Sequence, residues 1–184
     1  NLQQIQNVLH EWRADLGVAF DGDGDRMILV KNDGEIIWPD QLMIIFSKRI
    51  LESQKGKIVF DIKCSKHLND SILKSGGEPI VSRTGHSFIK KSMTDNNAIL
   101  GGEMSGHIFF NDKWFGFDDG VYAFLRIMEI LSNKKECNRI FNDLPKSITT
   151  PELTIAFKGN NHFTFMDKFV KLAEFNDCKK IDID

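Results

Sequence analysis

The sequence of 184 residues has few of the features that mark specialised classes of protein. Its three cysteines, Cys64, Cys137 and Cys178, are far apart and lack the pair spacing of metal ligands, so we expect a reducing, cytoplasmic compartment. The formal net charge of −2 includes no basic excess, which gives no electrostatic support for binding nucleic acid or an anionic membrane. No apolar run approaches the roughly eighteen residues that a membrane-spanning helix needs.

The length and the two ends of the chain predict a fragment. The chain is longer than one average domain but short for two. It begins with Asn1 rather than Met and stops at Asp184 within a strand-like run, whereas domain edges usually lie in polar linkers. We therefore expect the missing parts of a longer parent chain to be its partners. Cut edges would expose apolar surface, which predicts association or local disorder at both ends.

Helix and strand patterns alternate along most of the chain. Residues 2–13 have apolar residues at helical spacing, and an Asp33-Gly34 turn between two apolar runs predicts a hairpin. Asp40 is the expected N-cap of the second helix. This alternation predicts an α/β fold, a layered mixed sheet, largely parallel, with flanking helices. Helices are predicted over residues 2–13, 41–53, 66–74, 87–94, 121–131, 137–141 and 163–175, and strands over residues 16–20, 27–31, 35–38, 57–62, 79–82, 98–101, 107–110 and 152–157.

Residues 21–26, Asp-Gly-Asp-Gly-Asp-Arg, are the most informative stretch. They follow a predicted strand, and the glycines allow the chain to curl until the oxygens of Asp21, Asp23 and Asp25 converge. Carboxylates about 4 Å apart repel by roughly 1 kcal/mol per pair in water and by about 4 kcal/mol at an effective dielectric constant of about 20. A hard divalent cation removes that repulsion, and Mg²⁺ is the natural choice if a phosphate supplies a further ligand.

Other interpretations of this acidic loop differ in what they require. A calcium loop of the EF-hand type needs glycine at its sixth position and a bidentate acid at its twelfth, where the chain has Arg26 and Asn32, so that interpretation fails. A solvated acidic turn with its carboxylates splayed apart stays open. Arg26 could bind a bridging phosphate with its fork of donors, or it could simply offset the neighbouring negative charge.

A second group of polar residues follows another predicted strand. Glu103, Ser105 and His107 alternate, so extended backbone would place them on one face, where a carboxylate, a hydroxyl and an imidazole suit a sugar. His107 could also move a proton near neutral pH. The alternative is a glycine-rich β-turn with one capping glutamate and a surface histidine.

Two further residues lie where predicted strands end. Lys63 follows one strand, and His86 stands at a strand-to-helix turn, where exposed amides favour an anion. Each signal is weak alone, because Lys63 could be a solvated charge and His86 a residue that only begins a helix.

Five segments in order resemble the α-D-phosphohexomutases and, among them, bacterial phosphomannomutase/phosphoglucomutase. The resemblance runs from residue 15 to about residue 131 and more loosely to the end. It implies an enzyme of four α/β domains around one cleft, with Mg²⁺ beside a phosphoserine. The serine donates its phosphate to a hexose phosphate, and the resulting bisphosphate reorients before a phosphate returns to the serine. The five segments are residues 21–26, 61–64, 84–91, 102–107 and 114–120.

The resemblance also implies roles for residues at matching positions. The substrates would be mannose and glucose 1- and 6-phosphates, with the 1,6-bisphosphate as intermediate. Residues 117–120 would only begin a helix. The implied metal ligands are Asp21, Asp23 and Asp25, the implied catalytic residues are Arg26 beside the phosphoserine and His107 as proton acceptor, and the implied sugar or phosphate contacts are Lys63, His86, Glu103, Ser105 and His107.

The chain also departs from the family pattern. No serine lies in a Thr-Ala-Ser-His-Asn-Pro-like phosphoserine loop, and the phosphate-binding loop of the family's fourth domain is missing. The resemblance therefore implies that residues 1–36 are the end of domain 2 with the metal loop, residues 37–148 are domain 3 with the sugar-binding loop, and residues 149–184 begin domain 4. We expect the isolated chain to be inactive as a mutase.

Other functions remain open. Phosphoglucosamine mutase usually has Gln where Met104 stands, so Met104 together with residues 114–120 favours mannose and glucose phosphates. A noncatalytic module that binds a metal or a sugar phosphate is permitted by the missing serine loop. A metal-dependent phosphatase lacks an obvious nucleophile, because the aspartates are assigned to the metal.

Overall fold

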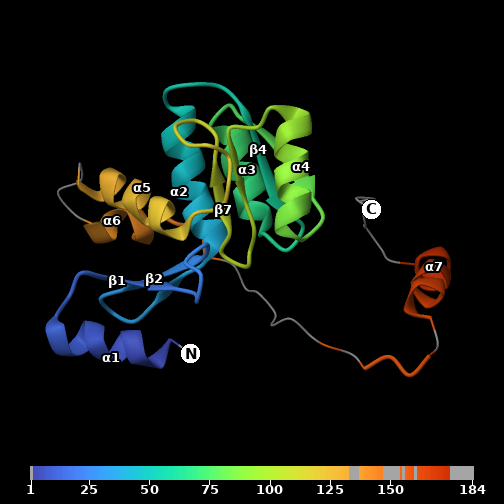
Figure 1. The fold of residues 1–184 in the computed structure, drawn as a ribbon, viewed down its shortest axis with the longest axis horizontal. Coiled ribbons are helices and arrows are strands. Elements are labelled where there is room, and N and C mark those ends of the chain that lie inside the picture. Colours follow the sequence, from blue (N-terminus) through green and yellow to red (C-terminus); the bar gives the residue numbers. More distant parts are fainter. Residues whose placement is uncertain (1, 133–136, 147–153, 155, 160, 175–184) are drawn as a thin grey trace. The chain divides into compact units, whose positions relative to one another are not determined.

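The computed structural model describes residues 2–132, 137–146, 154, 156–159 and 161–174, which belong to two compact units, residues 1–146 and 147–184 (Figure 1). The described part of the second unit contains helix α7 (His162–Leu172), where Asn161 Oδ1 accepts a hydrogen bond from the Thr164 amide at 3.2 Å. The first unit contains two sheets with their helices. No helix in the described residues is both long and apolar enough to cross a membrane. The predicted cytoplasmic location stays a prediction.

A three-stranded antiparallel sheet forms the beginning of the first unit. Helix α1 (Gln3–Trp12) precedes β1 (Leu16–Phe20), which pairs with β2 (Met27–Lys31), and β2 pairs with β3 (Ile36–Ile37). Phe20 pairs with Met27, so the acidic loop is the connection of the β1–β2 hairpin. The predicted second hairpin is confirmed, and Gly34 supplies the positive φ of its turn, 85°.

The second sheet has four strands in the order β5-β4-β6-β7. Strand β4 (Lys57–Asp61) runs parallel to β5 (Glu78–Ser82) and to β6 (Leu100–Gly102), whereas β7 (Ile108–Phe110) is antiparallel to β6. The prediction of a mixed, largely parallel sheet with flanking helices is therefore confirmed. The carboxyl ends of β4, β5 and β6 share one edge, from which residues 62–65, 83–85 and 103–107 leave the sheet; we call these three segments the carboxyl-edge loops.

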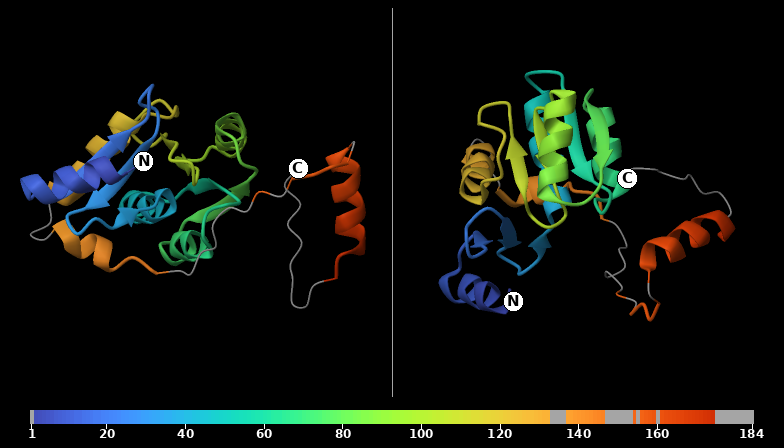
Figure 2. Two further views of the ribbon diagram at one scale, coloured as in Figure 1. Left: turned by 90° about the horizontal axis from the view of Figure 1, so that it is seen from below. Right: turned by 45° about the vertical axis from the view of Figure 1, so that its right-hand side comes forward.

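Helices cover both faces of this sheet (Figures 1 and 2). Helices α2 (Pro39–Leu51) and α3 (Lys66–Lys74) pack together on one face, and α4 (His86–Asn96) packs on the other. Helices α5 (Gly120–Ser132) and α6 (Cys137–Asn142) complete the first unit. The predicted helices agree with these bounds to within about two residues, apart from the ends that lie outside the described residues.

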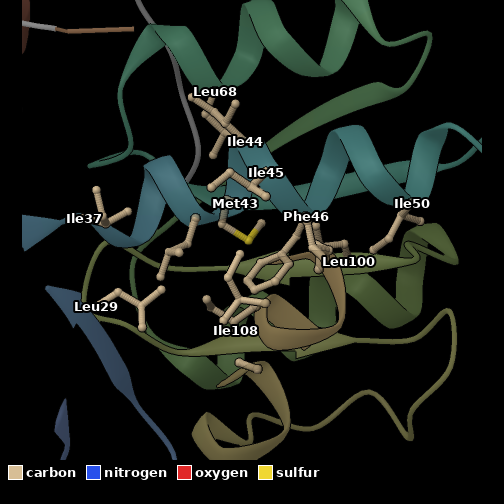
Figure 3. Close-up of a cluster of buried hydrophobic side chains, with 14 of the residues drawn as sticks. Leu29, Ile37, Met43, Ile44, Ile45, Phe46, Ile50, Leu68, Leu100 and Ile108 are labelled. Carbon is tan, nitrogen blue, oxygen red and sulfur yellow. The ribbon is translucent and has the colours of Figure 1, made fainter. Parts of the chain in front are cut away.

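Helix α2 lies at the centre of the larger core (Figure 3). Its residues 42–47 are all buried, which is typical of a helix enclosed on every side rather than of a surface helix. Phe46 packs edge-on against Phe110 with ring centroids 5.0 Å apart, and Met43 packs against Gly102, where a Cβ would lie 2.6 Å from the Met43 sulfur. The smaller core on the α4 face contains Val59, Ile89, Met93, Ala98 and Phe109.

Some sequence predictions differ from the structure. Asp40 is not the N-cap of α2, because the helix already begins at Pro39, whose fixed φ suits the first helical position, with Trp38 as N-cap. Asp40 is instead buried and accepts a hydrogen bond from the Ser65 amide at 3.1 Å. The described residues 154, 156 and 157 of the predicted strand 152–157 are not in a strand. The boundary at 149–151 and the run 180–184 lie outside the described residues, and the domain limits stay predictions.

Candidate active site

The acidic loop brings its three carboxylates together. Ligand oxygens of Asp21, Asp23 and Asp25 all lie within 4.8 Å of one another. The loop bends back with Gly24 at a φ of 76°, a conformation that an L-residue adopts only with strain. The alternative of a turn with splayed carboxylates is therefore wrong. Convergence arises from a bent loop between paired strands rather than from one extended segment.

Arg26 holds one member of this cluster. Its Nε lies 2.5 Å from Asp21 Oδ2 and its amide donates to Asp21 Oδ1 at 3.2 Å. Partial desolvation raises the pKa of Asp21, but the Arg26 side-chain and backbone hydrogen bonds outweigh it and lower this pKa to about 2. Arg26 is 45% exposed, so its guanidinium is accessible to a further anion while it neutralises the loop.

Asp25 is the member of the cluster whose carboxylate has a buried oxygen without a hydrogen bond among the described residues. This oxygen is Oδ1, although Arg26 Nε lies 3.6 Å away from it as an ion-pair contact. Desolvation raises the pKa of Asp25, and the charges of Asp23, Asp21 and Asp118 raise it further against the opposing effect of His107. A bound cation would satisfy this oxygen and remove the repulsion. The all-oxygen ligand set fits a hard divalent ion such as Mg²⁺.

His107 joins the sugar-binding loop to the acidic loop. The backbones of Arg26 and His107 form an isolated antiparallel bridge between the two sheets. The His107 Nδ1 lies 2.9 Å from Asp118 Oδ2 and 3.6 Å from Asp25 Oδ2. The imidazole thus stands directly against a predicted metal ligand.

Sequence reasoning missed the roles of Asp118 and Lys90. Lys90 Nζ lies 2.7 Å from Asp118 Oδ1, and although desolvation raises the pKa of Asp118, the Lys90 hydrogen bond lowers it overall. The sequence feature that could have indicated a role for Asp118 is the pair Asp118-Asp119 directly before α5. Asp119 Oδ1 accepts from the Tyr122 amide at 2.8 Å and caps the helix, which leaves Asp118 for another contact.

The segment with Glu103, Ser105 and His107 is a turn, so the prediction of extended backbone with three side chains on one face is wrong. The Gly106 amide donates to the Glu103 carbonyl at 3.1 Å, and Gly106 has a φ of 106°, which glycine permits. Glu103 is 2% exposed. Its Oε1 accepts from the Gly85 amide at 2.5 Å and its Oε2 from the Ser105 hydroxyl at 2.9 Å. A buried carboxylate needs such donors, which is why the chain turns here.

The remaining predicted contacts lie at the same edge of the sheet. His86 is exposed at the first turn of α4, and its ring centroid lies 5.6 Å from that of His107. Lys63 is exposed in the turn after β4, and Ser105 is exposed in its own turn. The structure therefore brings His86 and His107 together with the acidic loop, and it places Lys63 and Ser105 on neighbouring carboxyl-edge loops.

Gly120 is a further residue that the sequence analysis did not single out. Its amide donates to the Gly24 carbonyl at 3.0 Å, so the beginning of α5 rests directly on the acidic loop. A Cβ at Gly120 would lie 2.8 Å from the carbonyl oxygens of both Gly24 and Arg26. These are backbone atoms of the loop, and they cannot move without moving the carboxylates.

The mixed sheet, its two helical layers and the acidic loop define an α/β protein with a candidate metal site beside a polar loop. Residues 38–148 match the family model described as phosphoglucomutase/phosphomannomutase, alpha/beta/alpha domain III. The chain therefore belongs to the phosphoglucomutase/phosphomannomutase family, which confirms the resemblance.

Individual relatives agree with this assignment. The chain is 45% identical over 183 residues to a phosphoglucomutase of Neisseria meningitidis serogroup A / serotype 4A, an alignment that covers 98% of this chain and 40% of the relative. It is 44% identical over 186 residues to a phosphomannomutase/phosphoglucomutase of Pseudomonas syringae pv. tomato, covering 100% of this chain and 40% of the relative. The crystal structure of a phosphoglucomutase/phosphomannomutase family protein from Burkholderia thailandensis is 38% identical, with a TM-score of 0.91 over 99% of this chain and 39% of that chain. The chain spans about 40% of the length of the curated relatives it matches.

Proposed function

We propose that this chain is the metal-loop and sugar-loop part of a Mg²⁺-dependent phosphohexomutase. The enzyme would interconvert the 1- and 6-phosphates of mannose and glucose through an enzyme phosphoserine and a 1,6-bisphosphorylated sugar. The observation that carries this proposal is the converging carboxylate cluster, in which Asp25 Oδ1 is buried without a hydrogen bond from the described residues, packed against His107 of the sugar-binding loop. Family membership and the names of the relatives support the reaction class.

Asp21, Asp23 and Asp25 would hold the ion. When bound, Mg²⁺ would neutralise the charge of a phosphoryl group held beside it. Arg26 has a complementary role, because an ion at Asp21 competes with the Arg26 hydrogen bond to the same carboxylate. The guanidinium fork that is released would then be available to bind a phosphate.

His107 would take or return the proton of a sugar hydroxyl. His107 Nδ1 lies 2.9 Å from Asp118 Oδ2, a contact that would favour a proton on Nδ1 and leave Nε2 to accept one from the sugar. His86 and Lys63 would contact phosphate or sugar from the same edge of the sheet. Glu103 is 2% exposed and already accepts from the Gly85 amide and the Ser105 hydroxyl, so it would act on the sugar by holding the exposed Ser105 in place.

Magnesium titration by calorimetry tests whether the carboxylate cluster of the acidic loop binds Mg²⁺. Wild type should bind Mg²⁺, whereas Asp23→Asn should bind it much more weakly, because one of three ligands loses its charge. Asp70→Asn on α3 is the matched control and should bind as wild type does. Equal affinity of wild type and Asp23→Asn would remove the metal assignment.

Turnover tests the reaction. A full-length protein that carries this chain should interconvert mannose 1- and 6-phosphate, whereas the isolated 184-residue chain should not, since no serine in it has the phosphoserine context. Phosphoglucosamine mutase is the alternative, and assays with glucosamine 6-phosphate and mannose 6-phosphate in parallel separate the two. A full-length protein that binds Mg²⁺ but turns over neither sugar would favour the noncatalytic module, which the coverage of about 40% of the relatives keeps as a second candidate.

A further inference from the structure

Asp61 is a buried carboxylate at which all three carboxyl-edge loops meet. It is the last residue of β4 and is 0% exposed. Its Oδ1 accepts from the Cys64 thiol at 3.0 Å and from the Met104 amide at 3.1 Å. Its Oδ2 accepts from the Thr84 hydroxyl at 3.1 Å. One side chain therefore contacts three segments that are far apart in sequence.

Each of these contacts lies within two residues of an exposed side chain that the proposed function assigns to the substrate. Cys64 follows Lys63, Thr84 precedes His86 by two residues, and Met104 precedes Ser105. The Glu103 carboxylate adds a second connection, because it accepts from the Gly85 amide and the Ser105 hydroxyl. Displacing Asp61 would therefore change where the proposed substrate contacts lie without removing any of them.

We propose that Asp61 is a positioning residue that holds the three carboxyl-edge loops in a fixed relation, so that the side chains on these loops, and His86 directly after one of them, meet one ligand. The identity of the ligand as a hexose phosphate rests on the proposed function, whereas the hydrogen bonds of Asp61 are independent of it. Hydrogen bonds to a charged acceptor are stronger than neutral ones, and a buried acceptor leaves its donors no water to replace it. Burial and the neighbouring Asp61 raise the pKa of the Cys64 thiol, which keeps it protonated as a donor.

Two substitutions separate the role of the side chain from its size. Asp61→Ala removes all three contacts. Asp61→Asn keeps an acceptor for the Met104 amide and offers its own amide to the Thr84 hydroxyl, so it should restore most of the order.

The first measurement is amide hydrogen exchange and ¹⁵N relaxation on the 184-residue chain, which needs no catalysis. In Asp61→Ala the residues of the carboxyl-edge loops should exchange at least tenfold faster, while the amides of β4 and β6 stay protected. Asp61→Asn should resemble wild type. Unchanged loops in Asp61→Ala would overturn the proposal.

The second measurement uses a full-length protein that carries the chain. Asp61→Ala should raise KM for mannose 1-phosphate about tenfold, as expected for a lost buried charged hydrogen bond, with a smaller effect on kcat and none on Mg²⁺ affinity. An unchanged KM would also overturn the proposal. If the wild-type protein has no turnover, the proposed function fails, and the exchange measurement still decides the role of Asp61.

Two further variants guard against a simple loss of stability. If Asp61→Ala does not fold, Thr84→Val removes the Oδ2 contact alone from an exposed position and should loosen residues 83–86 only. Asp112→Asn is the matched control, because it weakens a different buried pair, with Arg126 at 2.8 and 2.9 Å. It should lower Tm without loosening the carboxyl-edge loops. Equal loosening in Asp112→Asn would show a general stability effect and refute positioning.

Discussion

The acidic loop and the carboxyl edge of the four-stranded sheet both gather carboxylates, but their oxygens have different surroundings. Asp61 and Glu103 are buried at 0% and 2% exposure, and each of their oxygens accepts a hydrogen bond from the chain itself. In the acidic loop, Asp25 has a buried oxygen without a donor and a raised pKa. The difference teaches that satisfied carboxylates fix a backbone, whereas unsatisfied neighbouring carboxylates indicate a site for a cation.

The largest effect is expected where the beginning of α5 packs on the backbone of the acidic loop. Gly120→Ala should lower the free energy of unfolding by about 1–3 kcal/mol, because the new Cβ would overlap two carbonyl oxygens of the acidic loop. It should also weaken Mg²⁺ binding. Gly22→Ala is the control, since a Cβ there meets nothing within 4 Å, and it should change stability by less than about 0.5 kcal/mol. Chemical denaturation and calorimetry measure both, and equal effects of the two variants would contradict the packing argument.

A second prediction is that removing the Asp25 charge stabilises the folded chain without metal, whereas removing the Asp61 side chain destabilises it. A carboxyl group with a raised pKa in the folded chain costs stability once it ionises, and this cost grows as pH rises through that pKa. Without metal at pH 7, Asp25→Asn should therefore stabilise the chain by about 0.2–1 kcal/mol, the range for partly exposed charge pairs. It should also reduce the rise in Tm that Mg²⁺ gives. Asp61→Ala should do the reverse, with lower stability and an unchanged response to Mg²⁺. If Asp25→Asn destabilised the chain without metal, the proposed contrast between a repelled carboxylate at Asp25 and a stabilising one at Asp61 would be wrong.

The smallest effect concerns Asp21, the carboxylate of the acidic loop that Arg26 holds by hydrogen bonds. Asp21 has a pKa of about 2, so the stability it contributes is present above its ordinary pKa of about 4 and is lost as pH falls through about 2. In Arg26→Gln the pKa should rise towards the ordinary value, though not fully, because the residue 26 amide still donates to Asp21. NMR titration of the carboxyl carbons measures this shift. Lys90→Gln should raise the pKa of Asp118 and leave Asp21 unchanged, and a shift of Asp21 in that variant would contradict a local cause.

Much of this arrangement could be predicted from local sequence. The acidic loop, its glycines and the Asp33-Gly34 turn are local patterns, and each has the predicted conformation or convergence. The strand–helix alternation likewise gave the mixed sheet with helices on both faces. The residue pattern alone identified which strand ends carry polar residues, and the family resemblance added the roles that these residues would have.

The contacts that decide the roles of buried groups could not be predicted in this way. Asp61 meets Thr84 and Met104 across 23 and 43 positions of sequence, and only parallel pairing of β4 with both neighbours brings them together. Glu103 gave the same signal in sequence as an exposed sugar ligand would, and only its burial shows the internal hydrogen bonds. Helix α2 begins at Pro39 rather than after Asp40, because the fixed φ of proline suits the first helical position.

The bridge between Arg26 and His107 has a consequence for movement. This bridge joins the three-stranded sheet directly to the four-stranded one. Residues 118–120 join them indirectly, because Asp118 contacts His107 and the Gly120 amide donates to the Gly24 carbonyl. A hinge between these sheets would have to break the bridge and at least one of these two contacts. If a full-length enzyme opens and closes around its sugar, the ion and the imidazole should travel as one rigid body, and the hinge should be sought elsewhere in the protein.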